Sequence, residues 1–238
     1  MDLKIKDVAE LLNVSETTIR RWLNDGKIPA YKIQGQYRFS RIEIENWVMS
    51  HKLSKEEGRS PFEKQSVQPK KSAVGSQKFS LYRALHKGCV LINVPGKTPA
   101  EVIANSTKEL SRSYKVDPEM LADLLIDRET LQPTALNNGL AVPHTREFIL
   151  TPHHDLVAVA FPEQPIAYGA LDGKPVHSLL FLFAGSDKRH LHLLAKLAHL
   201  SGQNAEFQKL LQKKPSKEEL LNFVKEWESQ IAAPSDEE

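Results

Sequence analysis

The sequence predicts an α/β (α+β) chain with two domains: a small one made of helices and a hairpin, and a larger one with a mixed β-sheet flanked by helices. Amphipathic helices separated by tight turns fill residues 1–50, and strand-like runs alternate with helix-like segments from residue 79 onward. Between them, residues 51–78 are polar and show no sustained apolar period. We therefore expect domains at 1–50 and 79–232, a flexible basic linker at 51–78 and an acidic tail at 233–238.

The composition is that of an ordinary globular protein, with 40% hydrophobic and 26% charged residues. The single cysteine, Cys89, excludes an intramolecular disulfide and a cysteine metal cluster, and we interpret it as a small buried residue. The longest apolar run, 179–184, is far shorter than the about 20 residues that span a bilayer. The first seven residues lack the apolar core of a signal peptide. We expect a cytoplasmic protein without a membrane partner.

The formal net charge of +2 is unevenly distributed along the chain. Residues 1–50 carry eight Lys/Arg against seven Asp/Glu, and residues 51–78 carry seven against three. The remainder holds 17 against 20. A basic N-terminal third favours contact with nucleic acid at that end only, although a basic solubilising spacer would look the same.

The first domain begins with a helix whose capped start we place at Asp7-Val8-Ala9-Glu10. A turn follows, in which Ser15 is a natural N-cap for a helix over residues 16–24. Ile19 and Leu23 face inward at a four-residue spacing, and we place Trp22 in the core rather than at a contact surface. The other side of this helix presents Thr17, Thr18, Arg20 and Arg21.

Residues 31–39 predict a short hairpin, because the turn Gln34-Gly35-Gln36 lies between Tyr31-Lys32-Ile33 and Tyr37-Arg38-Phe39. Ser40-Arg41-Ile42-Glu43 is a capping box that opens a helix through Trp47. Two helices joined by a tight turn, with small polar and basic residues early on the second, are typical of major-groove reading. The alternative is an amphipathic module with a solvated charged face.

Residues 3–50, with the segment DVAELLNVSETTIRRWLNDGKIPAYKIQGQYRFSRIEIENWV, resemble the MerR/excisionase-like winged helix-turn-helix family. The resemblance implies DNA as a partner. One copy of so small a module makes few phosphate contacts, so we expect a homodimer or added contacts from the basic linker. For Arg38 the alternative is a pair with an acid inside the domain. The implied recognition helix carries Thr17, Thr18, Arg20 and Arg21, and the implied wing carries Lys32, Gln34, Gln36 and Arg38.

The second domain shows strand-like runs interleaved with helix-like segments, which favours a mixed sheet between helical layers. The strand-like runs are 90–94, 156–161 and 179–183, with a short buried strand at 140–142. The helix-like segments are 98–111, 117–127, 190–200, 205–212 and 216–231.

A histidine in this domain has the setting that phosphoryl transfer requires. Gly139 permits a sharp turn, and Pro143 fixes the backbone just before His144. Neutral imidazole is a good nucleophile near pH 7, and the phosphoryl group needs cations and N–H donors around it. His190 lies in the first turn of a helix that we expect Asp187 to cap. The basic pair 188–189 at that helix start favours an anion. The alternative is that His144 is structural, which a single histidine after proline more often is.

Four pieces, DRE, GLAVPHTR, ALDGKPVHSLLFLFA and HLHLLAKLAHL, resemble enzyme IIA of the fructose/mannitol/nitrogen-related phosphotransferase system over residues 79–231. The resemblance implies that His144 is phosphorylated, that His190 supports the phosphoryl group, and that Arg128 is the active-site arginine. It also implies a mixed sheet sandwiched by helices and a histidine-containing phosphocarrier protein as phosphoryl donor. Asn137-Asn138 and Thr145 depart from the usual pattern of the family.

The favoured interpretation is a DNA-binding regulator whose DNA or partner contacts depend on phosphorylation of His144 through this phosphotransfer activity. A regulatory target protein is a further expected partner. The alternatives are a plain phosphocarrier that serves a separate sugar-transport subunit, and a partner-binding domain without phosphotransfer. Nucleotide-binding glycine motifs are absent from the sequence, and His190 and His192 face different ways on a helix, so we expect no cofactor and no metal site.

Overall fold

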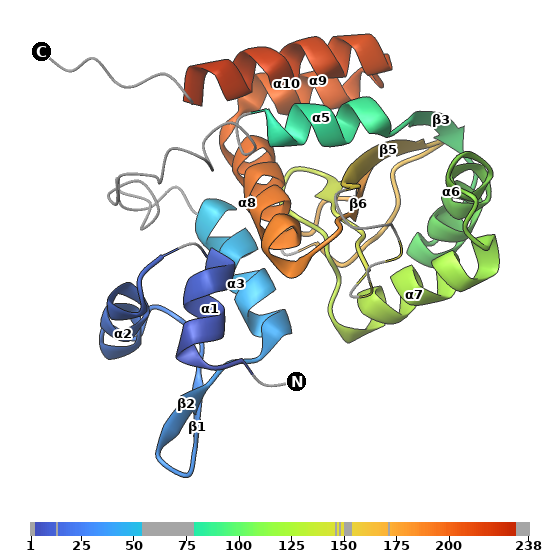
Figure 1. Cartoon of the computed structure of the whole chain (residues 1–238). Helices are drawn as coiled ribbons and strands as arrows, with labels where there is room; N and C mark the ends of the chain where they lie inside the picture. The colour runs from blue at the N-terminus through green and yellow to red at the C-terminus, as the bar shows by residue number, and fades with distance from the viewer. Residues whose placement is uncertain are drawn as a thin grey trace, which may run out of the picture.

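The computed structural model of this chain describes residues 3–12, 14–53, 79–145, 147, 149, 154–170 and 172–231 (Figure 1). The side chains of 50–53, 203 and 231 are not part of that description. Most of the expected linker at 51–78 and the expected tail at 233–238 lie outside the described residues. Among the residues that are described, no helix combines the length and apolar character needed to cross a membrane.

The first domain has the predicted order of two helices, a hairpin and a third helix. Ser15 caps the second helix, because its hydroxyl accepts the Thr18 N–H at 3.2 Å. The first helix starts two residues earlier than we expected, and Asp7 therefore lies inside its first turn, where it accepts the Lys4 N–H at 2.8 Å. The elements are α1 (Ile5–Leu12), α2 (Glu16–Asn24), β1 (Tyr31–Ile33), β2 (Gln36–Arg38) and α3 (Arg41–Leu53).

Two tryptophans anchor the core of the first domain. Trp22 is 2% exposed, and its ring centroid lies 5.4 Å from that of Trp47 on α3. Ile19 and Phe39 are fully buried beside them. The prediction that Trp22 belongs to the core is confirmed, and α2 is thereby fixed against α3 by its inward face.

The second domain is built on a four-stranded sheet with the order β3-β5-β6-β4. The outer pairs β3–β5 and β4–β6 are parallel, whereas the central pair β5–β6 is antiparallel. The predicted mixed sheet is therefore confirmed. The strands are β3 (Val90–Val94), β4 (Leu140–Ala141), β5 (Leu156–Pro162) and β6 (Ser178–Phe183).

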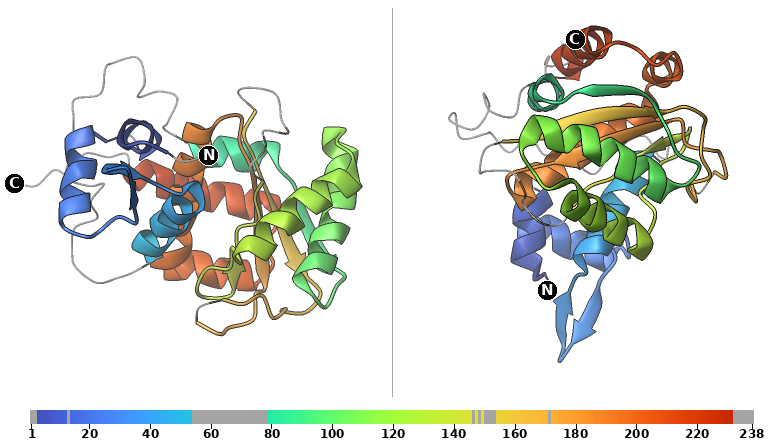
Figure 2. Two further views of the ribbon diagram at one scale, coloured as in Figure 1. Left: turned by 90° about the horizontal axis from the view of Figure 1, so that it is seen from below. Right: turned by 90° about the vertical axis from the view of Figure 1, so that its right-hand side faces the viewer.

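Helices cover both faces of this sheet, as the fully buried central strands require. On β5, Val157, Val159 and Phe161 pack on one face, and the alternate residues pack on the other. The first face is covered by α5 (Ser80–Lys87), α8 (Asp187–Gln203), α9 (Ala205–Gln212) and α10 (Lys217–Ile231). The second is covered by α6 (Pro99–Tyr114) and α7 (Pro118–Leu131), and Figure 2 shows the two layers.

Helix α5 and the cap of α8 differ from what the sequence predicts. Helix α5 is short, and Glu228 of α10 holds its start by accepting the N–H groups of Leu81 at 3.1 Å and Tyr82 at 2.9 Å. That partner lies far away in the sequence, so local patterns do not reveal it. The residue that caps α8 is Ser186, not Asp187, because the Ser186 hydroxyl accepts the Arg189 N–H.

The first domain packs against α8 through α3 and α1 (Figure 1). Met49 of α3 is 5% exposed and belongs to the apolar core of the second domain, against which Leu11 of α1 also packs. Ala195 of α8 in turn packs against the core of the first domain. The two cores therefore meet at this interface, and α3 lies beside the N-terminal half of α8.

Candidate active site at the domain interface

The backbone around His144 is fixed by the sheet. Gly139, just before β4, has a φ of 75°, and a Cβ there would lie 2.5 Å from the ring of His177. Pro143 accepts the Leu182 N–H through its carbonyl at 2.9 Å, so His144 continues the parallel pairing of β4 with β6. The His144 residue is fully buried. The predicted rigid strand end is thus present.

The hydrogen bond of the His144 ring determines which nitrogen is nucleophilic. Nδ1 lies 2.8 Å from the carbonyl oxygen of Val142. Because a carbonyl oxygen only accepts, Nδ1 carries the proton and donates it. In the neutral ring the lone pair is then on Nε2, which is buried and has no hydrogen-bond partner among the described residues. Nε2 is the atom that can attack an electrophile.

His190 and Arg128 lie around this nitrogen. The His190 ring, in the first turn of α8, has its centroid 4.9 Å from that of His144. Burial, together with the adjacent His144 ring, lowers the pKa of His190 to about 3, so this ring is neutral near pH 7. Arg128, in the last turn of α7, is 2% exposed and donates to the carbonyl oxygen of Gln132 at 2.9 Å. The three predicted site residues, Arg128, His144 and His190, therefore lie together in one buried cluster, which is called the cleft below.

A fourth residue in this cleft was not predicted, and it comes from the first domain. Glu45 of α3 is 1% exposed, and its carboxylate oxygens lie 3.7 Å from Nε2 of His144 and 3.7 Å from Nε2 of His190. The Arg128 guanidinium is 3.9 Å away, and Nε of Arg41 donates to Glu45 at 3.0 Å. Glu45 therefore sits at the centre of the predicted site.

The surroundings of Glu45 keep its carboxyl ionised. Burial would raise the pKa of this carboxyl, but the imidazoles of His144 and His190 in their protonated form, together with the guanidinium of Arg41, outweigh burial and hold the pKa well below its usual range. The cleft thus stabilises a negative charge at the point where the three predicted residues meet.

Local sequence carries no signal for this placement. Glu45 follows Arg41 by four residues on a helix, which is the spacing of an ordinary surface ion pair. Only the packing of α3 on α8 directs it into the second domain. Arg41 itself also pairs with Asp187 of α8, and Asn46 donates to Gln132, so a row of polar contacts follows α3 across the interface.

Glu45, His144 and His190 also offer one metal-ligand atom each, all within 4.8 Å of one another. Imidazole and carboxylate are suitable zinc ligands. The guanidinium groups of Arg128 and Arg41, however, already place two positive charges against the same carboxylate. A divalent cation there would be repelled by both of them, so the cleft is better suited to an anion.

The low pKa of His190 predicts a loss of stability in acid. His190 has a pKa of about 3 in the folded chain, against 6.5 when the chain is unfolded. Its contribution to stability is therefore fully present above pH 6.5. That stability is lost as the pH falls from 6.5 towards 3, and the lowered pKa of Glu45 acts in the same direction below pH 4.5. The groups facing His190 are His144, Glu45, Arg41 and Arg128.

We expect the free energy of unfolding to fall by roughly 1 kcal/mol per pH unit between pH 6 and 4 because of His190 alone. Urea unfolding at several pH values measures this fall. The His190→Gln variant should show a shallower pH dependence. Equal slopes in the two chains would contradict this explanation. Some slope should remain in the variant, because burial also lowers the pKa of His192, to about 4.

Most of the predicted DNA-contacting residues lie on the surface of the first domain. Thr17, Arg20 and Arg21 are exposed on α2. Lys32 of β1 is exposed, with its ammonium 4.8 Å from the centre of the Tyr37 ring. Figure 1 shows that α2 and the hairpin lie on the side of the first domain that faces away from the second domain.

Thr18 and Arg38 are less accessible than the other predicted DNA contacts. Thr18 is 3% exposed, and its hydroxyl lies 2.9 Å from that of Ser15. It faces the N-cap and the domain interior because the third residue of a capped helix folds back over its cap. Arg38 is partly buried and donates to the side chain of Gln36 at 2.9 Å and to the carbonyl of Tyr37, neither of which is the acid that we considered.

The basic pair at the start of α8 does not serve the cleft as predicted. Arg189 donates through Nε to both carboxylate oxygens of Asp155, at 2.9 and 2.7 Å. Its charge is therefore compensated there. Lys188 is exposed. The cationic groups beside His144 are instead Arg128 and, from the first domain, Arg41.

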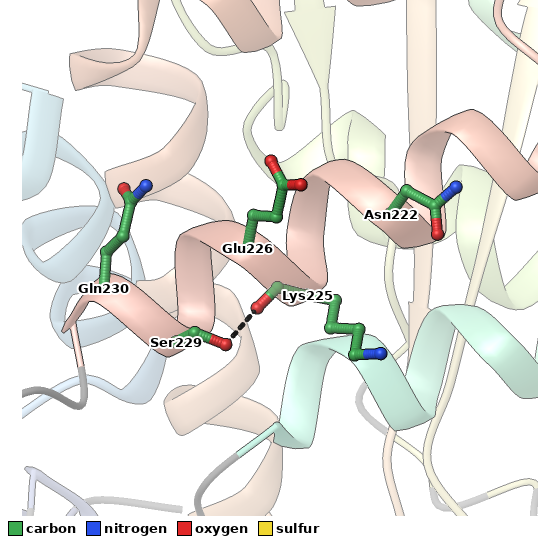
Figure 3. A pocket seen from close by; sticks show the side chains of 5 residues that line it. All are labelled: Asn222, Lys225, Glu226, Ser229 and Gln230. Carbon is green, nitrogen blue, oxygen red and sulfur yellow. Dashed lines mark hydrogen bonds between the residues drawn. The ribbon is translucent and has the colours of Figure 1, made fainter.

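A hollow on the surface of α10 lies apart from this chemistry. It is lined by Asn222, Lys225, Glu226, Ser229 and Gln230, and in Figure 3 the Ser229 hydroxyl donates to the Lys225 carbonyl at 2.8 Å. These residues follow one exposed helix face and do not converge on a single point. We assign no site there.

Comparison with known proteins agrees with both halves of this architecture. The model of the phosphoenolpyruvate-dependent sugar phosphotransferase system EIIA 2 family matches residues 83–227, and a helix-turn-helix domain model matches residues 3–52. A nitrogen regulatory protein of Pseudomonas aeruginosa is 30% identical over 147 residues, which are 60% of this chain and 94% of that protein.

Two further relatives extend the comparison. The transcriptional repressor DcmR of Methylorubrum extorquens is 44% identical over 54 residues, which are 23% of this chain and only 20% of the repressor. The crystal structure of the nitrogen regulatory protein IIA-Ntr of Neisseria meningitidis has the same fold as the second domain. Its TM-score is 0.52 at 24% identity, and the match covers 60% of this chain and 97% of that one. With the EIIA 2 model matching more than half of its residues, the chain belongs to the EIIA 2 family of the phosphotransferase system and carries an additional helix-turn-helix domain at residues 3–52.

Proposed function

We propose that this protein is a DNA-binding regulator whose second domain accepts a phosphoryl group on Nε2 of His144 from a histidine-containing phosphocarrier protein. The observation that carries the proposal is that Nε2 of His144 is buried and meets no hydrogen-bond partner among the residues described, and that the bond from Nδ1 to Val142 leaves the lone pair on it. The neutral His190 ring and the Arg128 guanidinium lie at the same point. Phosphoryl transfer to histidine requires such a nucleophilic nitrogen and a cationic group beside it.

In the proposed step, Nε2 of His144 attacks the phosphorus of the donor's phosphohistidine. A P–N bond forms at His144, the P–N bond of the donor breaks, and the donor imidazole leaves with the electron pair. His144 keeps its proton on Nδ1, shared with the Val142 carbonyl, so the positive charge that develops on the ring is stabilised by that carbonyl. Arg128 would balance the charge of the phosphoryl oxygens.

For the first domain, DNA binding is supported by the exposed residues Thr17, Arg20 and Arg21 on α2 and Lys32 on the hairpin. A basic helix surface that is free of the second domain fits contacts to the DNA backbone and base edges. The helix-turn-helix match and the likeness to a transcriptional repressor support the same role. The names of the nitrogen regulatory relatives support regulation rather than sugar transport.

The test is to incubate the chain with labelled phosphoenolpyruvate, enzyme I and the phosphocarrier protein, and to map the label. We expect acid-labile label on His144 and none in the His144→Ala variant. A chain that takes up no label, although a standard IIA protein in the same mixture is labelled, would remove phosphotransfer from the proposal.

The DNA half is tested separately by selecting bound sequences from a random library and measuring gel shifts with wild-type chain. Replacing Arg20 and Arg21 together by Gln should weaken binding and reduce its salt dependence. The matched control is Lys87→Gln at the end of α5, which lies on the second domain. Equal binding by all three chains would contradict the assignment of α2 as the recognition helix.

A further inference from the structure

The cleft around His144 is already occupied, and the occupant is the first domain itself. Helix α3 places the Glu45 carboxylate 3.7 Å from the Nε2 atoms of both histidines, where it is 1% exposed. Three atoms at this contact are buried without hydrogen-bond partners in the described part of the chain: Nε2 of His144, Nε2 of His190 and Oε2 of Glu45. Buried polar atoms are normally satisfied, so the carboxylate is an incomplete ligand for this cleft.

A phosphoryl group on His144 cannot coexist with Glu45 in this position. The 3.7 Å between Nε2 and the carboxylate oxygen is the length of one van der Waals contact, so a phosphorus atom and three oxygens bonded to Nε2 have no room. The phosphoryl group also brings nearly two negative charges against an ionised carboxylate in a buried cleft. Space and charge therefore both exclude joint occupancy.

The contact that holds Glu45 in place is an extended interface. Arg41 of α3 pairs with Asp187 at the start of α8, and Asn46 donates to Gln132 just after α7. The interface also has an apolar part, because Met49 of α3 packs in the core of the second domain. These contacts bring the first domain over His144, which is fully buried and so out of reach of a protein donor.

We propose that the His144 cleft is the docking site of the chain's own helix-turn-helix domain, with Glu45 as an internal ligand that a phosphoryl group displaces. In any one chain the cleft holds either the Glu45 carboxylate or the phosphoryl group, but not both. Phosphorylation of His144 releases the first domain from α8, and docking slows phosphorylation by covering Nε2. This inference rests on the proposed function, because it takes His144 as the acceptor.

Reciprocity follows from thermodynamic linkage. Whatever favours docking must disfavour phosphorylation by the same free energy, and DNA that selects one arrangement of the first domain must shift the phosphorylated fraction. Thr17, Arg20 and Arg21 of α2 are exposed in the docked chain, so docking constrains the orientation of the DNA-reading domain without burying these side chains.

The test compares initial rates of His144 labelling in full-length chains supplied with phosphoenolpyruvate, enzyme I and phosphocarrier protein. The Glu45→Ala variant leaves Arg128 and Arg41 without their shared carboxylate, which destabilises the docked state, so labelling should be about tenfold or more faster than in wild type. The matched control is Glu43→Ala, an exposed acid on the same helix, which should be labelled at the wild-type rate.

A second variant, Met49→Gln, weakens the apolar part of the interface without changing the charges in the cleft, and it should also accelerate labelling. Its response keeps the test decisive if Glu45→Ala perturbs folding. Equal labelling rates in all four chains would overturn the docking inference while leaving His144 as the acceptor. Absence of label from every chain would instead overturn the proposed phosphotransfer, and the inference with it.

Discussion

Replacing Arg128 with Gln is expected to slow phosphorylation of His144 by about 10²–10³-fold, the usual effect of removing one preorganised hydrogen-bond donor from a transition state. The Arg128 guanidinium is 2% exposed, and its position in the cleft is set by donation to the Gln132 carbonyl at 2.9 Å. Arg128 also contacts Glu45, so both the test chain and its reference should carry Glu45→Ala. Initial labelling rates then measure how Arg128 acts on the transferring phosphoryl group, without the effect of its contact with the Glu45 carboxylate.

Two comparisons make this result specific to Arg128. Arg128→Lys keeps a charge but loses the planar donor set, so it should recover only part of the rate. Arg112→Gln removes an arginine that is 73% exposed on α6 and should have no effect. If Arg128→Gln is labelled as fast as its reference, the guanidinium does not stabilise the transferring group.

Gly88→Ala is expected to lower the free energy of unfolding by about 3 kcal/mol or more, which urea titration would measure. Gly88 ends α5 and donates its N–H to the carbonyls of Ala84 and Leu85, just before β3. A Cβ there would overlap the Val157 carbonyl oxygen and lie 2.6 Å from its carbon. Both atoms belong to the backbone of the central strand β5, so relief requires the helix and the sheet to separate.

The matched control is Gly173→Ala, where a Cβ would meet no atom of the described residues within 4 Å. Its φ of 68° makes alanine unfavourable by about 1–2 kcal/mol without any clash. The comparison therefore separates backbone strain from steric overlap. A smaller loss for Gly88→Ala than for Gly173→Ala would contradict the packing of α5 against β5.

Much of the secondary structure follows from local chemistry. The apolar runs at β3, β5 and β6 and the Ser15 cap of α2 lie where the sequence placed them, because strand burial and capping depend on neighbouring residues. Helix α5 was missed because its start depends on Glu228, 147 residues after Leu81. The burial of Thr18 was missed because spacing on a helix alone does not show how the cap directs a side chain.

The residues of the cleft also fall into two groups, those that local sequence predicts and those that it does not. The motifs around His144, His190 and Arg128 indicated a shared site, and the structure brings them together around one carboxylate. That carboxylate was unpredictable from local pattern, since Glu45 and Arg41 read as a surface pair and only domain packing buries them. Likewise, Arg189 looked available to an anion, but Asp155, 34 residues away, pairs with it.

The most direct test of the account is the separation of the two domains before and after phosphorylation of His144. Dyes on cysteines introduced at Arg20 of α2 and Lys209 of α9, both exposed, in a chain with Cys89 replaced by Ala, would report that separation by energy transfer. We predict one short distance in the unmodified chain, a longer and broader distribution after phosphorylation, and recovery when the phosphate is removed. An unchanged distance in fully phosphorylated chain would contradict the claim that Glu45 and the phosphoryl group compete for one cleft.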